Sequence, residues 1–324
     1  MGSMKRTLPE RAGDGPDGQR PWTSRSLGSE FQHQIFYTLI RVFGRRGAYL
    51  VLYFVVAWYV LLRPSVRKRS SFYLNRRFPG RKVFQRLWDA YCLSLELGKV
   101  LVDRAVFGIL GPEKLQCSLS GQETLRAILA EGRGLILVTA HAGSWQLSMA
   151  SLVHLQVPVT LLIHREPGDV DRHFFEHGEQ QLPYRIIDPI GYLGGTLEML
   201  QVLKAGEVLC IMGDRVMGGE GSTLAVDFLG GAIRVPFSPY KLASATGAPI
   251  AVIFPHKSGP DSYAVQVARI IRVPENLGRS AKGYQSYADE FASSMDAFVA
   301  EYPYQFFNYF DMWTPPPPRT DPAE

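Results

Sequence analysis

Short apolar runs alternate with helical stretches between residues 134 and 271, and this alternation is the strongest constraint on the fold. Each run has the length of a β-strand. The predicted strands are residues 134–139, 157–163, 184–187, 208–212, 249–254 and 263–271. Helices fit between them near residues 145–154, 170–180, 194–204 and 239–246. Such alternation predicts an α/β domain with a mostly parallel central sheet flanked by helices.

The domain is predicted to span residues 71–313, a common size for one α/β unit. Residues 1–30 are polar and rich in Gly, Pro and Arg, and residues 314–324 carry four consecutive prolines, so both segments are predicted to be disordered. Within the domain, residues 83–110 form a predicted helix. Ser120 and Glu123 have the spacing of a capping box at the start of another helix.

Residues 31–70 are predicted to associate with a membrane as a hydrophobic helix. Their centre, residues 47–62, is an uncharged run with Arg41, Arg45 and Arg46 before it and Arg63, Arg67, Lys68 and Arg69 after it. As a helix the run covers about 24 Å, less than the ~30 Å hydrocarbon core. Its Tyr and Trp residues and basic flanks suit an anionic interface. A membrane-embedded anchor is favoured, and a single span or a buried core helix remain alternatives.

The cysteine spacing and the absence of several motifs narrow the possible classes of protein. The net charge is +5, and the three cysteines are widely spaced with no CxxC pair, which is typical of reduced thiols in a cytoplasmic protein. The chain contains no P-loop, no GxSxG sequence and no aromatic and basic array for nucleic acid.

The apolar run 134–139 leads to His141, which Gly143 and Ser144 follow before a helical stretch. Ligands of α/β sheets bind beyond the carboxyl ends of strands. A histidine there can act as a general base, and Gly143 would let backbone approach a ligand closely. The following helix would offer N–H groups to an oxyanion. The alternative is a histidine that only caps the strand.

The segment from His141 to Gln146 resembles the H-x-x-x-x-D/E motif of the lysophospholipid acyltransferase superfamily. The similarity is greatest to the bacterial branch that includes the lipid A late acyltransferases. Further segments resemble that branch in the same order, from about residue 48 to residue 313: residues 75–79, 213–216, 226–230, 235–243, 246–249 and 304–313.

The resemblance implies an acyltransferase with His141 as general base. It would move a fatty acyl group from an acyl carrier protein or coenzyme A thioester to the hydroxyl or amine of a lipid or glycolipid. The implied place is the cytoplasmic face of the bacterial inner membrane. The resemblance implies no metal, no cofactor beyond the thioester co-substrate, and no nucleic acid partner.

One residue departs from the motif, because Gln146 stands where the family has an acid. Gln146 can accept a hydrogen bond from the imidazole, but it supplies no charge. Asp214 is the first candidate for the missing carboxylate. The alternatives are a slow enzyme or an acyltransferase-like protein that binds lipid or acyl carrier without turnover.

Several residues are predicted to bind substrate. Gly143, Ser144 and Trp145 belong to the motif itself. Arg215 follows a strand and would clamp a phosphate or carboxylate, or else form a salt bridge with Asp214 or Glu220. The remaining two, near the third block of resemblance, are predicted to contact the acceptor or the donor's phosphopantetheine: Arg234 and Lys241.

A competing pattern is His173, Glu176 and His177, which matches H-x-x-E-H. On a helix the two histidines would share a face and could bind zinc, with Glu176 as base. A zinc hydrolase is therefore a distant alternative.

Overall fold

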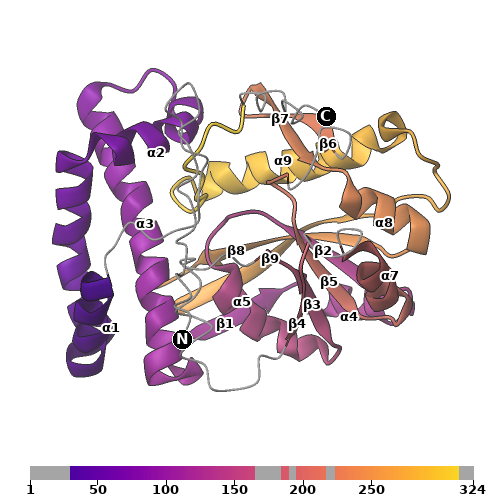
Figure 1. The fold of residues 1–324 in the computed structure, drawn as a ribbon, viewed down its shortest axis with the longest axis horizontal. Coiled ribbons are helices and arrows are strands. Elements are labelled where there is room, and N and C mark those ends of the chain that lie inside the picture. Colours follow the sequence, from indigo (N-terminus) through magenta and orange to yellow (C-terminus); the bar gives the residue numbers. More distant parts are fainter. Residues whose placement is uncertain (1–29, 165–183, 190–194, 217–222, 314–324) are drawn as a thin grey trace, which may run out of the picture.

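The computed structural model describes residues 30–164, 184–189, 195–216 and 223–313. It confirms the predicted α/β architecture, with a seven-stranded sheet and helices on both faces (Figure 1). The predicted terminal disorder, the whole of the predicted helix at 170–180 and the H-x-x-E-H pattern lie outside the described residues.

The strand order in the main sheet is β1-β9-β8-β2-β5-β3-β4. Neighbouring strands are parallel except β8 and β9, which are antiparallel. The strands are β1 (Gln116–Ser120), β2 (Leu135–Thr139), β3 (Val159–Leu162), β4 (Tyr184–Ile187), β5 (Val208–Met212), β8 (Ile250–Lys257) and β9 (Ser262–Ile271). The carboxyl ends of β2, β5 and β8 therefore meet at one edge of the sheet.

Helices cover the two faces because side chains alternate along each strand. In β2, Ile136 and Val138 belong to one core cluster, whereas Leu135 and Leu137 belong to the other. The first cluster includes buried residues of α7 (Thr196–Lys204), α8 (Ser238–Thr246) and α9 (Gln285–Glu301). The second includes those of α4 (Gln122–Leu129) and α5 (Trp145–Leu152).

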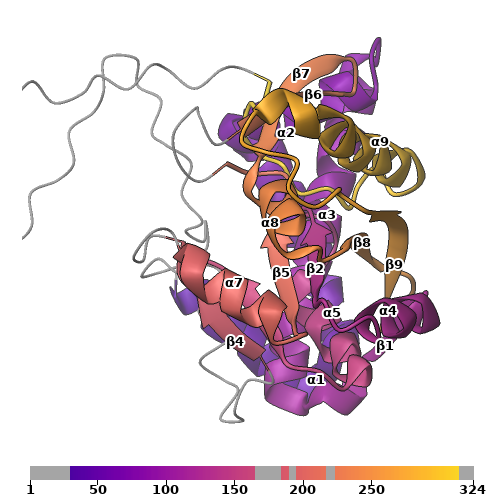
Figure 2. The same cartoon turned by 90° about the vertical axis from the view of Figure 1, so that its right-hand side faces the viewer.

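Two local predictions differ from the structure. The Ser120–Glu123 capping box is wrong, because Ser120 ends β1 and α4 is preceded by Gly121 in a left-handed conformation without a side-chain cap. A hairpin, β6 (Thr223–Phe228) and β7 (Gly231–Pro236), was not predicted as strands. It lies at the same end of the molecule as α2 and α9 (Figures 1 and 2).

Three helices at the amino-terminal side form a layer beside the sheet (Figure 1): α1 (Glu30–Leu62), α2 (Pro64–Arg77) and α3 (Val83–Leu110). The apolar run 47–62 is part of α1, which is kinked at Gly44. By length and composition, the segment Gln34–Leu62 could cross a membrane. In its apolar 18-residue stretch, 22% of the residues are buried inside the protein.

Helix α1 is apolar on two opposite faces. One face is buried in the core and includes Ala48, Leu52, Val56 and Val60 at every fourth position. The opposite face, called here the outer face of α1, exposes large side chains. Their exposed fractions are 62% for Leu50, 70% for Phe54 and 62% for Trp58. Helix α1 therefore packs with one face and exposes the other, and the interpretation of it as a wholly buried core helix does not describe its outer face.

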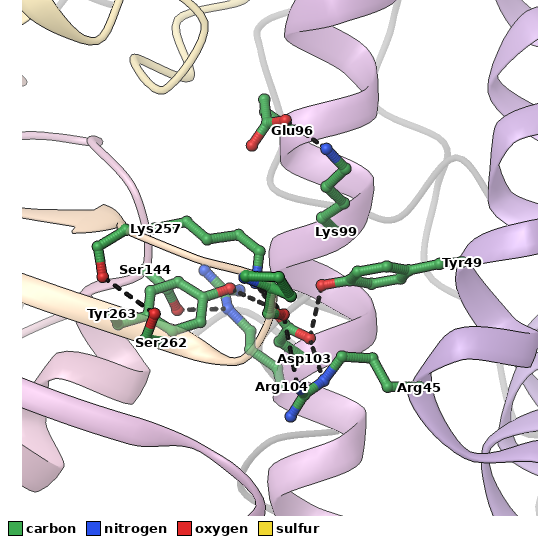
Figure 3. A network of polar contacts seen from close by, with 12 residues as sticks. Arg45, Tyr49, Glu96, Lys99, Asp103, Arg104, Ser144, Lys257, Ser262 and Tyr263 are labelled. Carbon is green, nitrogen blue, oxygen red and sulfur yellow. Dashed lines mark hydrogen bonds and ion pairs between the residues drawn. The ribbon is translucent and has the colours of Figure 1, made fainter.

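The Asp103 network joins this layer to the sheet (Figure 3). The Asp103 side chain of α3 is fully buried. Its Oδ1 lies 3.1 Å from Nε of Arg45 and accepts a 2.8 Å hydrogen bond from the Tyr49 hydroxyl, both from α1. Its Oδ2 accepts hydrogen bonds of 2.7 Å from Nζ of Lys257 in β8 and 2.6 Å from the hydroxyl of Tyr263 in β9.

Candidate active site

His141 and Asp214 meet at the carboxyl edge of the sheet. Strands β2 and β5 are parallel neighbours with Thr139 opposite Met212, so the residues just beyond their ends lie side by side. The Gly213 N–H donates a 2.7 Å hydrogen bond to the Thr139 carbonyl and continues this register. Nδ1 of His141 lies 2.9 Å from Oδ1 and 3.0 Å from Oδ2 of Asp214. The His141 backbone N–H also donates to Oδ2 at 3.1 Å.

The two side chains differ in burial. The Asp214 side chain is 2% exposed, whereas that of His141 is 26% exposed. Burial by itself raises the pKa of Asp214, but the His141 ring, the hydrogen bonds from His141 and the charge of Arg215 together hold that pKa below its ordinary value of 3.8. The pair is therefore a buried carboxylate facing a histidine that solvent or substrate can reach.

The loop after His141 is fixed by the segment 305–307, which follows α9. The Phe307 N–H donates to the His141 carbonyl at 2.8 Å, and the Gly143 N–H donates to the Gln305 carbonyl at 2.8 Å. Ala142 and Phe306 form an isolated antiparallel bridge between them. The distant closing segment thus holds the backbone that carries His141.

Gly143 is required by packing as well as by backbone conformation. Its φ is +50°, and a Cβ there would lie 2.2 Å from the carbonyl oxygen of Pro255 in β8. The absence of a side chain at Gly143 thus lets the loop backbone pack closely against β8. Because its N–H is bonded to Gln305, Gly143 serves in this structure to seat the loop.

The motif residues after Gly143 lie largely in the interior. Ser144 is fully buried, and its Oγ accepts hydrogen bonds from the Leu147 N–H at 3.5 Å and from Nε of Arg104 at 3.4 Å. Gln146 in α5 is 2% exposed, and Trp145 packs against the core cluster of α4 and α5. Asp214 therefore occupies the position on Nδ1 of His141 for which the sequence left Gln146 and Asp214 as candidates.

The three cationic residues predicted to bind substrate are placed differently. Arg215 follows Asp214 directly, and its guanidinium lies over the Phe310 ring, 5.3 Å from the centroid. Arg234, on β7, donates a 3.1 Å hydrogen bond to Thr223, and Lys241, on α8, lies 5.9 Å from the Phe237 ring centroid. Both of these residues are exposed, and the contacts just described are with Thr223 and Phe237 rather than with His141 or Asp214.

The residues of the zinc hypothesis, His173, Glu176 and His177, lie outside the described residues. Across residues 30–164, 184–189, 195–216 and 223–313 there is no group of three or more His, Cys, Asp or Glu side chains that could hold a metal ion.

Two supports of the site were not predicted. Arg104 reaches Ser144 from α3, and Gln305 holds Gly143 from the segment after α9. The segment 304–313 contributed to the family resemblance, but that pattern carried no indication of a contact with the His141 loop. Arg104 stands in a helix of ordinary composition, where no local signal marks a residue that reaches the site.

Comparison with known proteins is consistent with this architecture. The chain is 29% identical over 180 residues to the phosphatidylinositol mannoside acyltransferase of Mycolicibacterium smegmatis, covering 55% of this chain and 57% of that protein. It is 31% identical over 132 residues to the protein of that name from Mycobacterium tuberculosis, covering 40% of this chain and 41% of that protein. The chain thus spans about half the length of the curated relatives it matches.

The family comparison covers all of the described structure. Residues 29–313 match the family described as bacterial lipid A biosynthesis acyltransferase, from the start of α1 to the segment that holds the His141 loop. The chain therefore belongs to the bacterial lipid A biosynthesis acyltransferase family.

Proposed function

We propose that this protein is a membrane-associated acyltransferase. It transfers a fatty acyl group from a thioester of acyl carrier protein or coenzyme A to the hydroxyl or amine of a lipid or glycolipid. The observation that carries this proposal is the contact between His141 and the buried carboxylate of Asp214 at the carboxyl edge of the sheet. Family membership and the relatives' acyltransferase names support it.

The proposed chemistry follows from the geometry of the pair. With Asp214 on Nδ1, the neutral ring keeps its proton on that atom and presents the lone pair of Nε2. Nε2 removes the proton of the acceptor hydroxyl or amine as this group attacks the thioester carbonyl. The Asp214 charge stabilises the imidazolium that forms, as in serine hydrolases. The C–S bond then breaks, and the proton passes to the departing thiolate.

The acceptor is proposed to be a lipid with a polar headgroup. Two relatives are named phosphatidylinositol mannoside acyltransferases, so a glycolipid acceptor is the most specific form of the proposal. Arg215 next to Asp214 is suited to an anionic group of the acceptor. Arg234 and Lys241 are exposed and are proposed to meet the donor's phosphopantetheine or its carrier.

Membrane association is proposed through the outer face of α1. Leu50, Phe54 and Trp58 form an exposed apolar row along this helix. Basic residues contact the end of α1: the Arg63 guanidinium lies over the Tyr59 ring, and Arg67 of α2 donates hydrogen bonds to the Val60 and Leu61 carbonyls. An apolar face bordered by cations suits an anionic leaflet, and we place the protein at the cytoplasmic face of the bacterial inner membrane.

The alternative of a lipid- or carrier-binding protein without turnover depended on Gln146. The Asp214 contact supplies a carboxylate to His141 without the motif acid. This favours an enzyme over a binding protein.

The test is acyl transfer from radiolabelled acyl carrier protein and acyl-coenzyme A donors into total membrane lipid. Wild type is compared with His141→Ala and with His154→Ala, a matched control at an exposed histidine. We expect labelled lipid from wild type and the control, and none from His141→Ala. Lack of transfer by wild type from both donors would reject the enzyme and favour the binding protein.

A further inference from the structure

A cavity of 520 Å³ lies between the α1–α3 layer and the carboxyl edge of the sheet, away from the residues proposed for acyl transfer. Its walls come from four parts of the chain. They are Tyr49 and Tyr53 of α1, Glu96 and Lys99 of α3, the turn from Lys257 to Pro260, and the segment from Glu301 to Gln305.

The cavity is separate from His141 and Asp214, neither of which lines it. Gln305 stands between them. Its backbone carbonyl accepts the Gly143 N–H, while its side-chain amide bonds both the N–H and the carbonyl of Lys257, at 2.7 and 3.0 Å. A ligand in the cavity would touch the far side of the segment that holds the His141 loop.

The cations of the cavity are already paired within the protein. Nζ of Lys99 donates to Glu96 at 2.6 Å, and Nζ of Lys257 donates to Asp103 at 2.7 Å (Figure 3). Nζ of Lys257 also donates to the Pro260 carbonyl at 2.8 Å. An anionic ligand would have to break one of these pairs. The charge arrangement therefore favours a neutral ligand.

The aromatic lining favours a flat ligand surface. Four tyrosines line the cavity, and two hydroxyls are held by buried carboxylates, that of Tyr49 by Asp103 at 2.8 Å and that of Tyr304 by Asp89 at 2.7 Å. Tyr302 stacks on His256 with 4.2 Å between ring centroids. Such fixed rings suit the C–H faces of a sugar.

Acceptors of hydrogen bonds stand beside these rings. Glu96, Glu301 and the turn after β8 line the same space, and these residues carry carboxylate and carbonyl acceptors. Fixed aromatic rings next to carboxylates and carbonyls match a ligand that has apolar faces and many hydroxyl donors. We propose that the cavity binds a neutral polyhydroxyl group, a sugar or polyol, carried as the headgroup of a membrane lipid.

The lipid source follows from the position of the cavity beside α1. Tyr53 is 41% exposed and stands next in sequence to Phe54, a residue of the outer face. A headgroup in the cavity would thus leave its acyl chains near the apolar row of α1. This inference goes beyond the proposed acyl transfer. Because binding is measured without turnover, headgroup binding and acyl transfer can each be disproved independently of the other.

The experiment uses the full chain in phosphatidylcholine nanodiscs and saturation-transfer NMR with maltose as a neutral soluble probe. Glu301→Gln and Tyr302→Ala alter the cavity. Tyr59→Ala is the matched control, because Tyr59 lies on α1 outside the lining. Thermal unfolding of each variant verifies folding. If Tyr302→Ala is unstable, Glu301→Gln replaces it as the cavity variant, because Glu301 is exposed.

We expect maltose signals with wild type and Tyr59→Ala, and about tenfold weaker binding with Tyr302→Ala. Diglucosyl diacylglycerol placed in the nanodisc should suppress the maltose signal. Absence of a maltose signal, unchanged binding in both cavity variants, or suppression by inorganic phosphate instead would overturn the proposal. Maltose binding that the glycolipid leaves unchanged would overturn the assignment to a lipid headgroup.

Discussion

Nδ1 of His141 lies 2.9 Å from Oδ1 of Asp214, although 73 positions separate the two residues in the sequence. The contact arises because β2 and β5 are parallel neighbours that end together. His141 therefore receives its carboxylate from the end of the neighbouring strand β5. In the H-x-x-x-x-D/E motif, by contrast, the acid stands five residues after the histidine. The first prediction concerns this carboxylate.

Asp214→Asn removes the charge and keeps the shape. We expect the turnover rate of acyl transfer to fall by about 10⁴-fold, the effect of the equivalent change in a serine-protease triad. The control is Asp227→Asn, at an exposed position of β6, which should leave the rate unchanged. An Asp214→Asn rate within a few fold of wild type would show that Asp214 does not support His141.

Gln146→Glu restores the motif acid at a position that is 2% exposed. Because Asp214 already faces His141, we expect no gain in rate. The buried carboxylate should lower the unfolding free energy by about 1–3 kcal/mol. Urea unfolding and the acyl-transfer assay measure the two effects. A faster and equally stable Gln146→Glu enzyme would mean that the motif position, rather than Asp214, limits catalysis.

Gly143→Ala would place a Cβ 2.2 Å from the Pro255 carbonyl at a φ of +50°. Gly230→Ala is the matched control, since its φ is +69° and an added Cβ meets no atom within 4 Å. The control should lose about 1–2 kcal/mol from its backbone conformation alone, and Gly143→Ala more than that. Equal losses in urea unfolding would show that the loop can move away from β8.

Asp103→Ala would leave Lys257, whose side chain is 7% exposed, without its carboxylate. Burial already lowers the pKa of Lys257 and Asp103 opposes this, so the cation would lose its main stabilising partner. We expect a loss of about 3–5 kcal/mol in unfolding free energy. Glu275→Gln, in an exposed pair with Arg133, should cost less than about 1 kcal/mol. Similar losses in unfolding free energy for both variants would show that the Asp103 network does not anchor α1 to the sheet.

His256 should make stability depend on pH. Burial lowers the pKa of native His256 below the ordinary value of 6.5. Near and just below pH 6.5, the unfolded chain therefore binds more protons at this residue than the native chain does. Its contribution is complete above pH 6.5 and declines as the pH falls below that value. Urea unfolding from about pH 7.5 to about pH 5.5 should show a shallower decline for His256→Asn than for wild type. Identical slopes would contradict the prediction.

Much of the sheet could be predicted from the sequence because its central strands are apolar on both faces. The predicted strand at residues 208–212 coincides with β5, and the predicted helix at 83–110 coincides with α3. Strand β1 was missed because its residues, Gln116–Ser120, are largely polar and half exposed at a sheet edge. The capping box failed because the backbone at Gly121 turns left-handed before α4 begins.

The sequence by itself determined the fold class and the apolar helix α1 and singled out His141 as the candidate base, because periodicity, apolar runs and a histidine just after a strand are local patterns. It offered Asp214 only as the first candidate for the missing carboxylate. Only the tertiary structure decided that Asp214 faces His141, that Gln305 holds Gly143, and that Asp103 joins α1 to the sheet. These contacts depend on strand order, register and burial between distant segments. No local spacing encodes them, because each is set by which strands and helices become neighbours when the core closes.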